Sequence, residues 1–163
     1  MLRWIPRNAL LRLAGLTGDR RAAYLSDNAD VAERGKILLA GRVLTDAVFR
    51  ANVLRMLDAR GPGPTWAYRF SWPSRKDGLA GHCIDVPFFF DCLDGPALEP
   101  LTGGNPPQSI ADELHCVAVD FITAGKPGWS RYDEPGNPIQ IFDTPSAVRP
   151  DGYAQVRALA PRR

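Results

Sequence analysis

Apolar positions in the first sixty residues recur at helical spacing. Asn8 to Leu16 is short and apolar, and the stretch from Ala29 to Val43 also has a helical pattern, although it contains two glycines. From Asp46 to Ala59, apolar side chains lie along one side of a helix that Gly61 would terminate. These side chains are Val48, Phe49, Val53, Met56 and Leu57. The front of the chain is therefore predicted to be helical.

The period changes to two in the segment Trp66–Trp72, which is typical of a strand. Its aromatic residues, Trp66, Tyr68, Phe70 and Trp72, share one face and need an extensive apolar surface to pack against. A short last strand is predicted at Ile139–Phe142. The residues after it, 144–163, are predicted to form a loose tail.

The most regular helical pattern runs from Ser109 to Ala124. Its apolar stripe follows the i, i+4, i+7, i+11 spacing, with Ile110, Leu114, Val117 and Phe121. Ser109 is predicted to cap the start of this helix, and Gly125 is predicted to take the left-handed conformation that ends it. The pattern therefore predicts helices in the front of the chain and strands joined by long turns in the back.

Composition narrows the class of protein further. The chain has 163 residues and a mass of 17.9 kDa, which fits one domain or part of a larger one. Its net charge of +2 gives no argument for nucleic acid as a partner. The longest apolar runs are far shorter than a membrane-spanning helix, so no membrane partner is expected.

The three cysteines are not expected to form a disulfide framework. Their number is odd, and the start of the chain lacks the apolar core of a signal peptide, so Cys83, Cys92 and Cys116 are predicted to be free, partly buried thiols in the cytoplasm. A basic start leaves a mitochondrial presequence as an alternative to an ordinary helix. The cysteines lie near His82 and His115, but no CxxC or HxxxH spacing occurs, so no metal and no other cofactor is predicted.

Of the two histidines, His82 is the better candidate for acid–base chemistry. It lies in a loop after the aromatic strand, where a side chain can meet solvent or substrate, whereas His115 lies beside the buried stripe of a helix. A structural role is the competing interpretation for both. No G-x-S-x-G pentapeptide is present to supply a serine nucleophile, and no glycine-rich phosphate loop occurs.

Several blocks, in order, resemble the C-terminal part of the type B carboxylesterases. The chain has Thr45-Asp-Ala-Val-Phe49 where the family has TDxxF at a helix start, and Trp66–Trp72 resembles its vYxYxF strand. Leu79–Phe90 resembles the block around the catalytic histidine, and Ile110–Tyr132 resembles the helix and GxPxW turn that follow. Residues 37–143 carry the resemblance. Departures include Asn52, Ala80-Gly81, Val117 and Ser130, where the family usually has proline, Gly-Ala, tryptophan and proline.

This resemblance implies a fold and a site. The fold would be the last strands of an α/β-hydrolase sheet with flanking helices, so that residues 1–163 form a single partial domain. His82 would be the catalytic histidine, and Asp85, three residues later, would have a supporting role because it is not the family's triad acid. The serine elbow, the oxyanion-hole glycines and the acid lie upstream of the matched region in the family.

Two functions remain open at this point. In the first, the chain is a fragment of a serine hydrolase that cleaves a small carboxylic ester, and it is nearly inactive alone. In the second, it is a non-catalytic module that binds a protein partner, which supplies the rest of the sheet, through its exposed strand edge.

Overall fold

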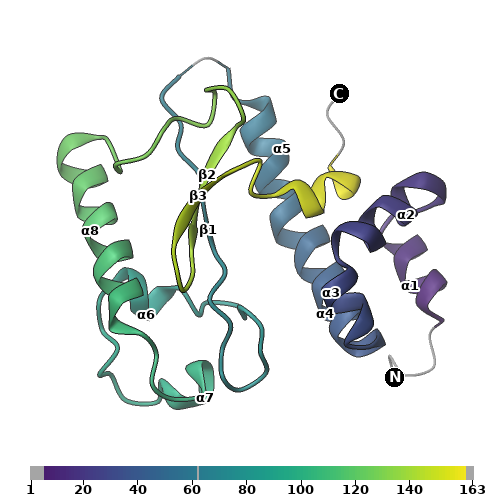
Figure 1. Cartoon of the computed structure of the whole chain (residues 1–163), viewed down its shortest axis with the longest axis horizontal. Helices are drawn as coiled ribbons and strands as arrows, with labels where there is room; N and C mark the ends of the chain where they lie inside the picture. Colours follow the sequence, from purple (N-terminus) through teal and green to yellow (C-terminus); the bar gives the residue numbers. More distant parts are fainter. Residues whose placement is uncertain (1–5, 62, 161–163) are drawn as a thin grey trace. The chain divides into compact units, whose positions relative to one another are not determined.

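The computed structural model describes residues 6–61 and 63–160, and these form two compact units. The first unit belongs to Met1–Gly63 and Tyr153–Arg163, and the second is Pro64–Gly152. The sequence predicted a single partial domain over residues 1–163. In the structure, the described residues from Tyr153 onward belong to the same unit as the start of the chain. Figure 1 shows the elements of both units.

The first unit is helical, as predicted. Its elements are α1 (Arg7–Leu13), α2 (Gly18–Asp27), α3 (Ala29–Glu33), α4 (Lys36–Thr45), a π-helical turn η2 (Asp46–Arg50), α5 (Ala51–Ala59) and the 3₁₀ helix η3 (Ala154–Leu159). The predicted helix from Ala29 to Val43 is divided at Gly35, whose φ of 117° only glycine adopts readily. From Lys36 to Ala59 the helical elements follow one another without a gap.

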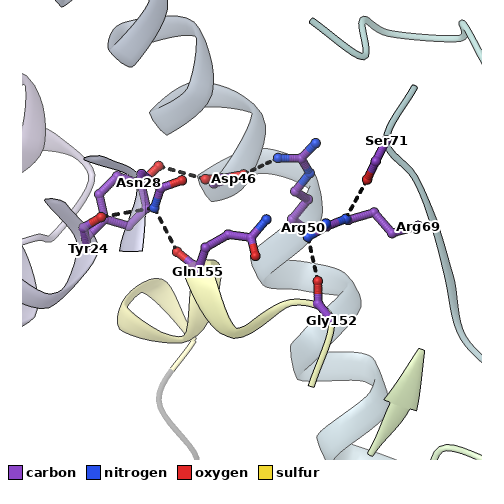
Figure 2. A network of polar contacts seen from close by, with 8 residues as sticks. All are labelled: Tyr24, Asn28, Asp46, Arg50, Arg69, Ser71, Gly152 and Gln155. Carbon is purple, nitrogen blue, oxygen red and sulfur yellow. Dashed lines mark hydrogen bonds and ion pairs between the residues drawn. The ribbon is translucent and has the colours of Figure 1, made fainter. Parts of the chain in front are cut away.

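A buried polar network lies inside this first unit (Figure 2). The carboxylate of Asp46 is fully buried and accepts a hydrogen bond from the Tyr24 hydroxyl at 2.7 Å. Arg50, one helical turn later, donates to the other carboxylate oxygen at 2.9 Å. Asn28 donates to the carbonyl oxygens of Tyr24 and Gln155, each at 3.0 Å. The network thus joins α2, the π-helical turn and η3.

The predicted burial of one helix face in this unit is wrong. The predicted apolar face of residues 46–59 is largely exposed, since Val48, Phe49 and Met56 are 47%, 52% and 70% exposed. The buried face instead carries Asp46, Ala51 and Leu54, and a buried aspartate is not recognisable as a core residue from an apolar pattern.

The predicted loose tail at 144–163 is wrong over residues 147–159. This segment forms strand β3 (Ala147–Pro150) in the second unit and η3 in the first, where Val156 and Leu159 are buried. Polar side chains also hold η3: Arg20 and Arg55 donate to carbonyl oxygens of Ala158 and Leu159. Residues 161–163 of the predicted tail lie outside the described residues.

The second unit is a mixed three-stranded sheet with helices. Strand β1 (Tyr68–Phe70) pairs parallel with β2 (Pro138–Phe142), which pairs antiparallel with β3, in the order β1-β2-β3. The helices are α6 (Val86–Phe89), α7 (Glu99–Thr102) and α8 (Gln108–Ala124). Figure 1 shows α8 running alongside the three strands. This arrangement is a partial α/β fold, as predicted from the sequence.

The core of this unit joins the aromatic strand to α6 and α8. Its buried members are Phe70, Trp72, Ile84, Phe88, Ile110, Ala111, Leu114 and Phe142. Gly125 ends α8 with a φ of 68°, as predicted, but Ser109 is not the cap, because the helix begins at Gln108 after Pro107. The predicted last strand is β2, and β3 follows it.

Candidate functional site

His82 lies in the turn that leads directly into α6. β1 ends at Phe70, the chain runs through an irregular segment, and residues 82–85 then form the turn before Val86. Pro87 stands in the first turn of α6, where its missing N–H costs no hydrogen bond. The His82 side chain is exposed, as its position in a loop predicted. Strand, turn and helix thus present one imidazole at the surface of the second unit.

One buried residue within the turn and one in α6 attach this segment to the core. Ile84 is 2% exposed and Phe88 is fully buried. The Phe88 ring lies 4.9 Å from the ring of Phe70 and 5.4 Å from that of Trp72, measured between centroids. Aromatic pairs at such separations are favourable beyond the area that they bury. The exposed His82 therefore lies on a segment whose neighbouring side chains are packed in the core.

Asp85, the predicted supporting residue, lies at the N-terminal end of α6 and is half-buried. Its backbone is helical and its side chain makes no capping hydrogen bond. Burial, with a further contribution from the negative charge of Asp85, raises the pKa of Tyr68 on β1. The sequence pattern did not reveal this electrostatic effect of Asp85 on Tyr68.

The cysteines differ from the prediction. All three are free, as predicted, but each is exposed rather than partly buried. Cys83, beside His82, has a φ of 61° and so occupies the left-handed region that few non-glycine residues adopt. Over residues 6–61 and 63–160, no three His, Cys, Asp or Glu side chains lie close enough together to hold a metal ion. No helix in the same ranges has the length and apolar character to cross a bilayer.

His115 has a defined partner on α6. Its Nδ1 lies 3.0 Å from the carbonyl oxygen of Phe89, the last residue of that helix. The His115 side chain is half-buried, while Ile110 and Leu114 on the same helix are buried in the core. His82 thus lies just before the start of α6, and His115, which belongs to α8, contacts the last residue of α6.

An apolar hollow of about 180 Å³ lies between the aromatic strand and α8. Its lining residues are Trp66, Tyr68, Phe89, Leu114, Val117, Ala118, Phe121, Ile122, Pro127 and Trp129. The predicted aromatic face is therefore divided: Phe70 and Trp72 are core residues, whereas Trp66 and Tyr68 line the hollow. Within the described residues, β1 is an edge strand of the three-stranded sheet and pairs with β2.

The fold of this chain is similar to part of the α/β-hydrolase fold of carboxylesterases. The chain aligns with the Geobacillus stearothermophilus carboxylesterase EST55 at a TM-score of 0.74 and 23% identity, over 98% of this chain and 36% of that one. It aligns with PNB esterase at a TM-score of 0.65 and 23% identity, over 74% and 27% of the two chains. The motif resemblance to a C-terminal segment of these enzymes is confirmed.

Sequence comparison gives a consistent result. Phenmedipham hydrolase of Pseudarthrobacter oxydans is 34% identical over an alignment of 92 residues, which covers 52% of this chain and 19% of that protein. An esterase from Clostridium hathewayi, which hydrolyses aliphatic aromatic polyesters, has a TM-score of 0.62 and 19% identity. No family model matches the chain. The chain thus spans about a fifth of the curated relative and about a third of the solved esterases.

Proposed function

We propose that this chain is the C-terminal segment of a serine ester hydrolase, in which His82 is the general base and then the general acid. The observation that carries the proposal is the exposed His82 on a turn that is packed against the core before α6, in a fold similar to that of carboxylesterases. The three exposed thiols favour a reducing compartment, so the proposal includes a cytoplasmic location.

The chemistry divides between this segment and the sequence that would precede it. Neutral His82 accepts the proton of a serine hydroxyl while the serine oxygen bonds to the ester carbonyl carbon. The protonated imidazole then gives that proton to the leaving alcohol as the ester C–O bond breaks. Water repeats the two steps and releases the acid. The serine, its oxyanion hole and the triad acid would come from the preceding segment, and Asp85 would support the turn rather than orient the imidazole.

A hybrid protein tests this proposal. The chain is joined to the upstream part of phenmedipham hydrolase, ending where the sequence match begins, and hydrolysis of p-nitrophenyl acetate is compared with that of a His82→Ala hybrid. We expect turnover that depends on His82 in the hybrid, and no such turnover from the chain alone. A folded hybrid whose turnover is unchanged by His82→Ala would refute the role of His82.

A second function is favoured by the position of β1 at the edge of its sheet and by the apolar hollow beside it. In this alternative the chain has no catalytic role and binds a protein that supplies strands to this edge. Size exclusion of the purified chain, alone and mixed with the upstream part of the relative, separates the two functions. A stoichiometric complex without ester turnover favours the binding module, whereas a complex with His82-dependent turnover favours the hydrolase.

A further inference from the structure

The carbonyl groups of α6 are each matched by a donor. The oxygens of Val86, Pro87 and Phe88 accept hydrogen bonds from the backbone N–H groups of Phe90, Cys92 and Asp91, at 3.1, 2.9 and 3.2 Å. The fourth oxygen, that of Phe89, lies 3.0 Å from Nδ1 of His115. The last carbonyls of a helix have no partner within the helix and need one from elsewhere. His115 supplies that partner for α6.

The direction of this bond follows from its chemistry. A carbonyl oxygen only accepts, so Nδ1 of His115 must carry the hydrogen. Nδ1 is protonated in one neutral tautomer of the ring and also in the imidazolium ion.

We infer that His115 is a positioning residue that fixes α6 and, through it, the turn that carries His82. This inference rests on the proposed function of His82. α6 has four residues, and so short a helix is not stable on its own. Phe88 anchors its middle in the core and His115 holds its end to α8, which is 17 residues long. Both attachments restrain the segment that begins at His82.

Two variants separate the hydrogen bond from the packing of the ring. In His115→Asn, the side-chain nitrogen occupies nearly the place of Nδ1 and can still donate to Phe89. In His115→Leu, a side chain of comparable size has no donor. Both variants leave His82 as the one histidine of the chain, because the sequence contains two. The NMR signal of the remaining imidazole then reports on His82 without ambiguity.

The experiment measures that imidazole signal and the hydrogen exchange of residues 86–92 in the full chain. Losing one hydrogen bond at the end of α6 should speed exchange there about 3- to 10-fold in His115→Leu. The His82 signal should broaden or shift in that variant and return to its wild-type position in His115→Asn. Exchange at residues 110–114 of α8 serves as the internal control and should stay unchanged.

Two results would overturn the inference. One is a His115→Leu variant with wild-type exchange at 86–92 and a wild-type His82 signal. The other is a His115→Asn variant that changes as much as His115→Leu, because the donor would then not be the feature that matters. Neither measurement requires ester turnover. A hybrid without His82-dependent hydrolysis would refute the proposed function. The structural coupling between His115 and His82 would still be decided by the NMR signal and the hydrogen exchange.

Discussion

Replacing Tyr24 by phenylalanine removes one hydroxyl from the buried network of the first unit and leaves the ring in place. Oδ2 of Asp46 then loses its 2.7 Å donor in a site where the carboxylate is fully buried (Figure 2). Because water does not reach the vacated oxygen, the loss is not made good by solvent. The perturbation therefore measures how much a buried hydrogen bond stabilises the helical unit.

The expected size follows from the charge of the acceptor. A hydrogen bond to a charged group contributes about 1.5–3 kcal/mol, so Tyr24→Phe should lower the free energy of unfolding by about 2 kcal/mol. Asp46→Ala removes both bonds and leaves Arg50, whose side chain is 14% exposed, without its ion pair. Asp46→Ala should therefore lower the free energy of unfolding by about 3–5 kcal/mol.

Asp58→Ala is the matched control in the same unit. It also removes a carboxylate from an arginine, since Asp58 pairs with Arg157 at 2.6 Å, but the two side chains are 26% and 18% exposed. Screening by solvent should keep its cost below about 1 kcal/mol.

Urea unfolding followed by circular dichroism at 222 nm is the assay, because the first unit is helical. Equal midpoints for wild type and Tyr24→Phe would refute the reasoning, as would an Asp58→Ala variant that loses as much as Tyr24→Phe. The double variant Tyr24→Phe/Asp46→Ala should be about as stable as Asp46→Ala alone, and simple additivity would contradict a direct interaction.

Three further predictions concern pH, packing and exposure. Burial, and then the charge of Asp46, raises the pKa of Tyr24 above its ordinary value of 10.0. Above about pH 10 the unfolded chain therefore loses a proton that the folded chain keeps, which favours unfolding. The urea midpoint of the wild-type chain should fall as the pH rises above about 10, and it should fall less steeply in Tyr24→Phe. In urea unfolding, Phe88→Ala should lower the free energy of unfolding by about 3–5 kcal/mol. Phe90 is 64% exposed, so Phe90→Ala should lower it by under about 0.5 kcal/mol. Similar losses in the two variants would contradict the placement of Phe88 in the core. Ellman's reagent should react with all three thiols without denaturant, and a thiol that reacts only after unfolding would contradict its exposure.

Local patterns predicted the elements that are held by their own apolar faces. The stripe of α8 and the alternation around β1 identified a helix and a strand whose buried residues, such as Leu114 and Phe70, do lie in one core. The face of residues 46–59 could not be read in this way, because its burial depends on Tyr24 and Arg50 satisfying a carboxylate. No property of residue 46 itself indicates that these partners are near.

The end of the chain was misjudged for a related reason. Residues 154–159 have a weak local pattern, and their order comes from distant partners, with Arg20 donating to Ala158 and Asn28 to Gln155. In the site, loop position was enough to predict that His82 is exposed. The bond from His115 to Phe89 depends on how α6 and α8 pack, which residue spacing alone does not specify.

The most direct test of the central claim is the ratio of kcat/KM for p-nitrophenyl acetate between the hybrid and its His82→Ala variant. If His82 is the base that activates the serine, the ratio should be about 10⁴ to 10⁶, as found when the histidine of a serine triad is removed. A ratio near one in two equally folded hybrids would contradict the account, and the likeness to carboxylesterases would then describe the fold of this chain and not its chemistry.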